Sequence, residues 1–296
     1  MPKSQIIFNR WSHIQFHSWP LMVFKSYNEE LSSHLWIDEI HFETFKKNIN
    51  QYNDSDKLSG IFVIPKFSRN HITIGEFKAL QKEKNNWIHL NCVMAMSANF
   101  ETYLQSVISL AIESNPGILI GASKAIDGVV LLKNGSLNKD SYRQKLVKCT
   151  EGSWKNRIDS FERLFGTVPT LLQSNIVELD RIRNIRNKIG HAFGRDIDAS
   201  RAFDKKTTLI SETVSIGRVK KWLRLFYDIA FEVDEYLLDN HIGEFQAILA
   251  YHKNFDTYKN LFLKERINLF KQEYGKIDQQ IGKVFCKGLI EYYDSI

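Results

Sequence analysis

Several motifs of well-known enzyme classes are missing from this sequence. It contains no Gly-rich phosphate loop, no HExxH pair for a metal ion and no nucleophile elbow. Its three cysteines, Cys92, Cys149 and Cys286, are scattered along the chain and lack the spacing of metal ligands. These absences argue against nucleotide hydrolases and metallohydrolases, predict no bound metal or cofactor, and favour reduced thiols.

Long apolar runs are missing as well. No stretch approaches the roughly 20 apolar residues that a membrane-spanning helix needs, and the first residues lack the apolar core of a secretion signal. No internal repeat or low-complexity tract is evident. We therefore expect a folded protein of the cytoplasm that does not contact a membrane.

What the sequence does contain is helical periodicity. Apolar residues recur at steps of three and four in four long segments, and no strand pattern lies between them. The expected helices are 86–115, 153–165 with Ser153 as N-cap, 170–191 and 216–237. This order predicts a mostly α-helical fold, an antiparallel helical bundle at its centre.

The flanking regions are less regular. A helix is expected near 38–51, and the segments GIFVIPKF and HITIG within 60–75 are compatible with a short β-hairpin. Short helices are expected after residue 240. The predicted organisation is an N-terminal region 1–86 without a functional interpretation, a bundle 87–239 and a C-terminal helical extension 240–296.

The most informative segment is RNKIGH, residues 186–191. Arg186 is followed directly by the polar residue Asn187. His191, five positions after the arginine, lies at the end of an expected helix. With nine histidines in the chain, about one Arg-x(4–6)-His pattern is expected by chance. A second match, Arg10 with His17, lies in a stretch without helical period, and we interpret that one as accidental.

The positive charge is concentrated around this segment. Between residues 143 and 195 there are eleven basic and five acidic residues, and the difference equals the net charge of +6 of the whole chain. The basic residues are Arg143, Lys145, Lys148, Lys155, Arg157, Arg163, Arg181, Arg183, Arg186, Lys188 and Arg195. Such a zone would attract a polyanion, although solvated helix faces are the commoner reason for Lys and Arg.

The residue types suit metal-free RNA cleavage. The reaction needs a general base, a general acid and a cation for the charge that develops on phosphorus. Histidine fits the first two tasks and arginine the third. One motif supplies a single histidine, so a symmetric homodimer is expected, in which two copies form one composite site.

The motif and its surroundings resemble the HEPN superfamily of ribonucleases with an Arg-x(4–6)-His motif. The resemblance covers roughly residues 87–239 and rests on the helix order, on ANFETYLQSVISLAIES and on IRNKIGHAFGR. It implies that Arg186 and His191 are catalytic and that Asn187 is the supporting polar residue. It further implies a metal-independent endoribonuclease acting on tRNA or mRNA as a toxin or antiphage effector, with an antitoxin or defence protein as a partner.

Some assignments stay open at this point. Asn187 and His191, four residues apart, share a helix face, so Asn187 is expected either to bond the imidazole or to contact a phosphate. Glu101 is a supporting site residue or, as is more common, an ion-pair carboxylate. We assign phosphate contacts to three residues, Arg183, Lys188 and Arg195.

Two less specific interpretations stand beside these. His191 and Arg186 would also suit a helix C-terminus and a surface ion pair with Glu178 or Asp180. Some HEPN proteins keep the fold and lose the nuclease. The alternative function is therefore a catalytically inactive HEPN module that binds RNA or a partner protein.

Overall fold

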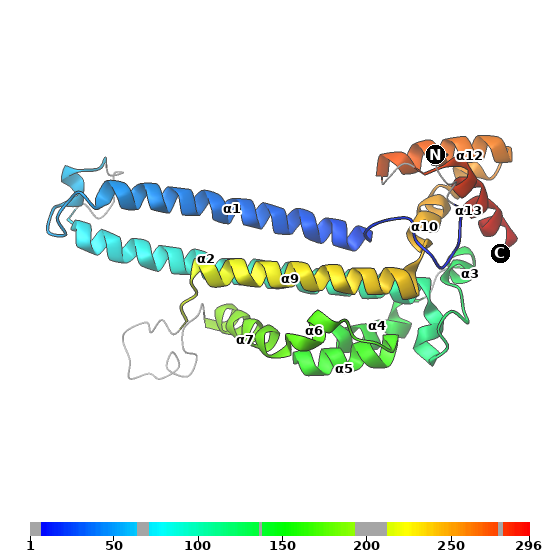
Figure 1. The fold of residues 1–296 in the computed structure, drawn as a ribbon, viewed down its shortest axis with the longest axis horizontal. Coiled ribbons are helices and arrows are strands. Elements are labelled where there is room, and N and C mark those ends of the chain that lie inside the picture. Colours follow the sequence, from blue (N-terminus) through cyan, green and yellow to red (C-terminus); the bar gives the residue numbers. More distant parts are fainter. Residues whose placement is uncertain (1–6, 64–70, 136–137, 193–211, 278–280) are drawn as a thin grey trace, which may run out of the picture. The chain divides into compact units, whose positions relative to one another are not determined.

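The structure, a computed structural model, describes residues 7–63, 71–135, 138–192, 212–277 and 281–296, which are mostly α-helical (Figure 1). The helices are α1 (Trp19–Ile49), α2 (Ile74–Ser114), α3 (Gly128–Lys133), α4 (Lys139–Thr150), α5 (Trp154–Phe165), α6 (Thr170–Ser174), α7 (Ile176–Ala192), α9 (Ile216–Leu237), α10 (Phe245–Lys253), α11 (Phe255–Tyr258), α12 (Leu263–Ile277) and α13 (Lys283–Ser295). Short 3₁₀ turns cover Leu58–Gly60 and Pro116–Ile120, and a π-helical turn covers Leu238–Ile242. The predicted mostly α-helical class is confirmed.

The chain forms two compact units. Unit 1 comprises Met1–Phe24, Glu101–Ile176 and Asp228–Ile296, and unit 2 comprises Lys25–Phe100 and Val177–Tyr227. The predicted boundaries at 86/87 and 239/240 do not coincide with these divisions. The reason is that α2 continues without a break through residue 86, and the turn Leu238–Ile242 continues directly from α9.

Within unit 2, α1 and α2 form an antiparallel helical hairpin. The rings of Phe45 and Phe77 meet edge to face at 5.4 Å, and Lys84 lies 3.5 Å from Asp38. From the first contact to the second, the residue number falls along α1 and rises along α2, so the two helices run in opposite directions. The helix expected near 38–51 is therefore the last part of a much longer one, and the helix expected from residue 86 begins at Ile74.

The start of α2 corrects the expected hairpin near 60–75. The Thr73 hydroxyl accepts a bond from the Glu76 N–H, and the Glu76 carboxylate accepts one from the Thr73 N–H, at 3.3 and 2.8 Å. This reciprocal arrangement is a capping box, which starts a helix where a strand was expected. In the described part of this segment, only an isolated bridge pairs Lys57 with Thr73. Residues 64–70 lie outside the described ranges.

Contacts among α2, α7 and α9 define their directions in unit 2. The His89 Nδ1–H donates to the Val214 carbonyl at 2.7 Å, and the rings of Phe100 and Phe226 stack at 4.5 Å. From the first contact to the second, the residue numbers rise on both sides, so α2 and α9 are parallel. Helix α7 is antiparallel to α9, because Glu178 accepts a bond from Trp222 whereas Lys188, later in α7, pairs with Glu212. The expected antiparallel arrangement thus holds for α7 but not for the pair α2 and α9.

Two local expectations from the sequence can be compared directly. Ser153 does cap α5, since its side chain accepts a bond from the Asn156 N–H. The helix expected over 170–191 is instead divided into α6 and α7 at Asn175. The Asn175 amide donates to the Leu171 carbonyl at 2.8 Å, a local bond that competes with helix continuation.

The helices were also compared with the dimensions of a lipid bilayer. Within the ranges given above, no helix combines the length and the apolar character that crossing a membrane requires.

Candidate functional site

Helix α7 in unit 2 carries the Arg/His motif. Its buried face consists of Leu179, Ile182, Ile185 and Ile189, spaced three and four residues apart as on one side of a helix. This apolar stripe fixes the rotation of α7 about its axis. As a consequence, the residues of the motif lie at the edge of the stripe or on the solvent side.

The motif residues differ in exposure and in contacts. Arg186 and Asn187 are half-buried, and His191 is exposed in the last turn. The Arg186 guanidinium donates from Nη1 to the Asn187 side-chain oxygen at 3.1 Å. This contact differs from both tasks expected for Asn187, which were to bond the imidazole or to contact a phosphate. In the structure, Asn187 holds the arginine. No hydrogen bond between Asn187 and His191 is present.

Helix geometry separates the arginine from the histidine. Positions five apart differ by about 140° around the axis and about 7.5 Å along it. His191 makes no hydrogen bond to another described residue of the chain, so its imidazole is open to a ligand. Gly190 beside it leaves an open helix surface: a Cβ built there would lie 3.9 Å from the Met94 side chain, an ordinary contact.

The residues assigned to phosphate contacts already have partners within unit 2. Arg183 bonds Asp180 at 3.0 Å, and Lys188 pairs with Glu212. Both ion pairs are partly exposed, so exchange for a phosphate would cost little. Arg195 lies outside the described residues.

Glu101 belongs to unit 1 and pairs with Arg157 there, at 3.1 Å. Arg157 is 4% exposed and also donates to the Gly152 carbonyl at 3.1 Å. The contact is the interhelical ion pair that was one of the two interpretations of Glu101. A role of Glu101 beside Arg186 stays a prediction.

In the second Arg/His match, Arg10 and His17, the arginine stabilises the fold. Arg10 is 5% exposed and donates to Asp127, to the Ser114 carbonyl at 3.0 Å and to the Ile242 carbonyl at 2.9 Å. Its partners come from three distant segments of unit 1. Sequence reasoning missed this cluster, because no local spacing connects residues more than a hundred positions apart.

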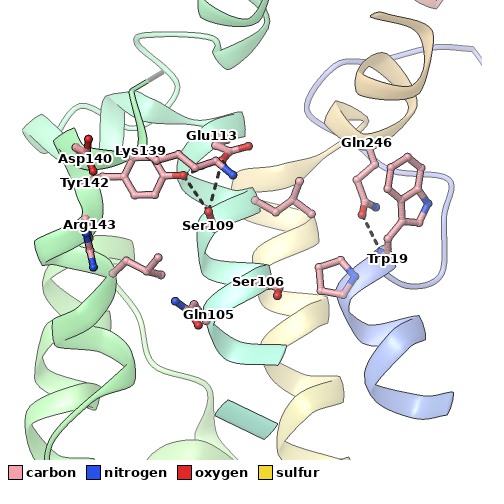
Figure 2. A pocket seen from close by; sticks show the side chains of 13 residues that line it. Trp19, Gln105, Ser106, Ser109, Glu113, Lys139, Asp140, Tyr142, Arg143 and Gln246 are labelled. Atoms are coloured by element: carbon pink, nitrogen blue, oxygen red, sulfur yellow. Dashed lines mark hydrogen bonds and ion pairs between the residues drawn. The ribbon is translucent and has the colours of Figure 1, made fainter. Parts of the chain in front are cut away.

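A cleft of about 580 Å³ in unit 1 is a further candidate for a binding site (Figure 2). Figure 2 shows Tyr142 and Arg143 of α4 on one side and Trp19 and Gln246 on the other. The Tyr142 hydroxyl donates to the Glu113 carboxylate at 2.7 Å, and burial followed by this carboxylate raises the Tyr142 pKa to about 12. The lining carries carboxylates and a lysine but no histidine, the side chain whose ordinary pKa lies near neutral pH.

The thiols offer no nucleophile either. Burial raises the pKa of Cys92 and Cys286 to about 11 and that of Cys149 to about 12. A thiol is reactive as its thiolate, and these groups stay protonated at neutral pH. In the described ranges, His, Cys, Asp and Glu side chains form no group of three or more that could hold a metal ion.

Comparison with protein-family models, with curated proteins and with solved structures finds no match to this chain.

Proposed function

We propose that this protein is a metal-independent endoribonuclease whose site consists of Arg186 and His191 from two copies of the chain. The observation that carries the proposal is the arrangement on α7. Asn187 positions the arginine, and the histidine is exposed one turn later. The basic residues of α7 add attraction for a polyanion.

The chemistry follows from the residue types. One His191 removes the proton from a ribose 2′-hydroxyl, whose oxygen then attacks the adjacent phosphorus. The bond from phosphorus to the 5′-oxygen breaks, and His191 of the second copy donates a proton to that oxygen. Arg186 stabilises the negative charge on the non-bridging oxygens. The products are a 2′,3′-cyclic phosphate and a 5′-hydroxyl.

The biological part of the proposal rests on the resemblance to the HEPN superfamily. It assigns the protein to the toxins or antiphage effectors, with tRNA or mRNA as substrate and an antitoxin or defence protein as its regulator. The alternative, an inactive module that binds RNA or a protein partner, keeps the same surface and removes only the chemistry.

The test is cleavage of total tRNA and of a long single-stranded RNA in the presence of EDTA. The wild-type protein should cut, whereas Arg186→Ala and His191→Ala should not. Asn187→Ala should cut more slowly, because the guanidinium loses the acceptor that positions it. His34→Ala, at an exposed histidine of α1, is the matched control and should retain full activity. RNA binding without cleavage by every variant would favour the inactive module.

A further inference from the structure

A second basic feature lies between α4 and α5 of unit 1. These two helices pack against each other, and a pocket of about 180 Å³ opens between them. Lys145 and Lys148 of α4 line it together with Ser160, Arg163 and Leu164 of α5. Each helix contributes polar residues three positions apart, which places both members of each pair on the same helix face. Two helices thus direct three cations and one hydroxyl to one small volume.

The charge of this pocket is not balanced by carboxylates. None of the five lining residues is acidic. Within the described residues, neither Lys148 nor Arg163 has a carboxylate oxygen within 4 Å, and Lys145 donates to the Leu119 carbonyl. Other cations of the chain, such as Arg157 and Arg183, do have carboxylate partners. Three like charges around one pocket repel one another, and an anion bound among them would remove that cost.

The size and chemistry of the pocket indicate which anion fits. A volume of about 180 Å³ is below the roughly 300 Å³ at which sites for whole small molecules begin, so the pocket suits a single group. Arg163 can bind two oxygens at once, the lysines add point charges, and Ser160 donates a hydroxyl. This donor set matches a phosphate group. The buried Leu164 adds an apolar side chain to the lining.

We propose that this α4–α5 pocket binds a backbone phosphate of RNA other than the one at the cleaved bond. The inference rests on the proposed function for the identity of the polyanion. The pocket contains neither Arg186 nor His191, so the phosphate bound here contributes affinity and not the proposed chemistry.

The experiment measures RNA binding in a protein that does not cut. A labelled single-stranded RNA is titrated with His191→Ala over a series of KCl concentrations, with and without Lys148→Gln and Arg163→Gln. Loss of the one bound phosphate should weaken binding and reduce the slope of log K against log salt by about 0.7. The control carries Lys264→Gln and Lys283→Gln, two exposed lysines of unit 1 outside the pocket, and should bind like the parent.

The outcomes separate this inference from the proposed function. Unchanged affinity and slope in the pocket variant would overturn the inference, even if the wild-type protein cleaves RNA. Weaker binding by the pocket variant alone would support it, even if the wild-type protein proves unable to cleave. Inorganic phosphate is the second probe. If it raises the Tm through Lys148 and Arg163 while RNA binding does not depend on them, the site takes free phosphate and the RNA assignment is wrong. Absence of RNA binding by the parent would overturn the inference as well.

Discussion

At the scale of single residues, burial separates the two arginines that the motif search found. Arg10 is enclosed among acceptors of unit 1, and burial lowers its pKa although the Asp127 carboxylate opposes that shift. Arg186 is half-buried and held by a neighbouring amide. The first arrangement fixes a fold, and the second positions a guanidinium at the partly exposed edge of α7.

Arg10→Leu should therefore unfold the protein more easily. The substitution removes the cation that pairs with the buried side of Asp127 and one donor each from the Ser114 and Ile242 carbonyls. Asp127 keeps the hydroxyl of Tyr292 but loses its opposite charge, and breaking such a buried pair costs about 3 kcal/mol or more. Urea unfolding measures the loss, and Arg143→Leu at an exposed site is the control. An unchanged free energy of unfolding combined with lost RNA cleavage would contradict the structural role.

Two buried groups of unit 1 should make stability depend on pH in opposite directions. Burial, followed by Lys124, lowers the pKa of His241 to about 4. The unfolded chain, with a histidine pKa of 6.5, then binds the proton first, and stability falls as the pH drops from 6.5 to 4. Burial raises the pKa of Asp234 to about 6 against the hydrogen bonds from Ser18. Here the folded state binds the proton first, and stability rises as the pH drops from 6 to 3.8.

The corresponding variants separate the two contributions. Between pH 7 and 5, His241→Gln should reduce the loss of stability and Asp234→Asn should increase it, each by about 1 to 2 kcal/mol. Thermal unfolding across this pH range measures both. If stability changed with pH equally in both variants, neither group would titrate as its burial requires.

At the scale of helices, periodicity and caps explain what the sequence could predict. The apolar spacing of Leu179, Ile182 and Ile189 identified α7 and its buried face, and Ser153 identified the first residue of α5. The capping box of Thr73 and Glu76 was also present in the sequence, but the β-branched residues around it favoured a strand. Its physical effect, two donors satisfied at once, determines the local structure.

Contacts between distant segments could not be predicted in this way. Glu101 pairs with Arg157, and the partners of Arg10 lie up to 232 positions away. Such pairs depend on which helix faces meet, and that information is spread over the whole chain. The position of Asn187 beside Arg186 likewise depends on rotamers that a spacing rule does not contain.

Gly190→Ala tests the surface of α7. A Cβ at this position meets only the far end of Met94 at 3.9 Å, so no strain is expected. Alanine favours a helix over glycine by roughly 0.5 to 1 kcal/mol, and the Tm should rise accordingly. Gly217→Ala, in α9 with no neighbour within 4 Å, provides a second measurement of the same effect. A lower Tm for Gly190→Ala alone would show that the surface of α7 is occupied by something else.

At the scale of the whole molecule, the proposed reaction requires two copies of the chain. Each chain supplies one His191, and the reaction needs an acid and a base at the same time. A copy carrying His191→Ala should therefore inactivate the wild-type copy with which it pairs. The basic pocket between α4 and α5 contains neither Arg186 nor His191, so it supplies no acid or base to this reaction.

Mixed dimers measure this dependence. With nine variant chains for each wild-type chain, random pairing leaves about one wild-type chain in ten with a wild-type partner. Activity for each wild-type chain should then fall about tenfold after coexpression. Activity proportional to the wild-type chains would mean that each copy cuts alone, which contradicts the composite site.

The central claim is that His191 performs metal-free cleavage of RNA. The most direct measurement is the chemical identity of the new RNA ends after incubation with purified protein in EDTA, wild type beside His191→Ala. The account predicts 2′,3′-cyclic phosphate and 5′-hydroxyl ends with the wild type and intact RNA with the variant. Equal cleavage by both proteins, or intact RNA with both, would contradict it.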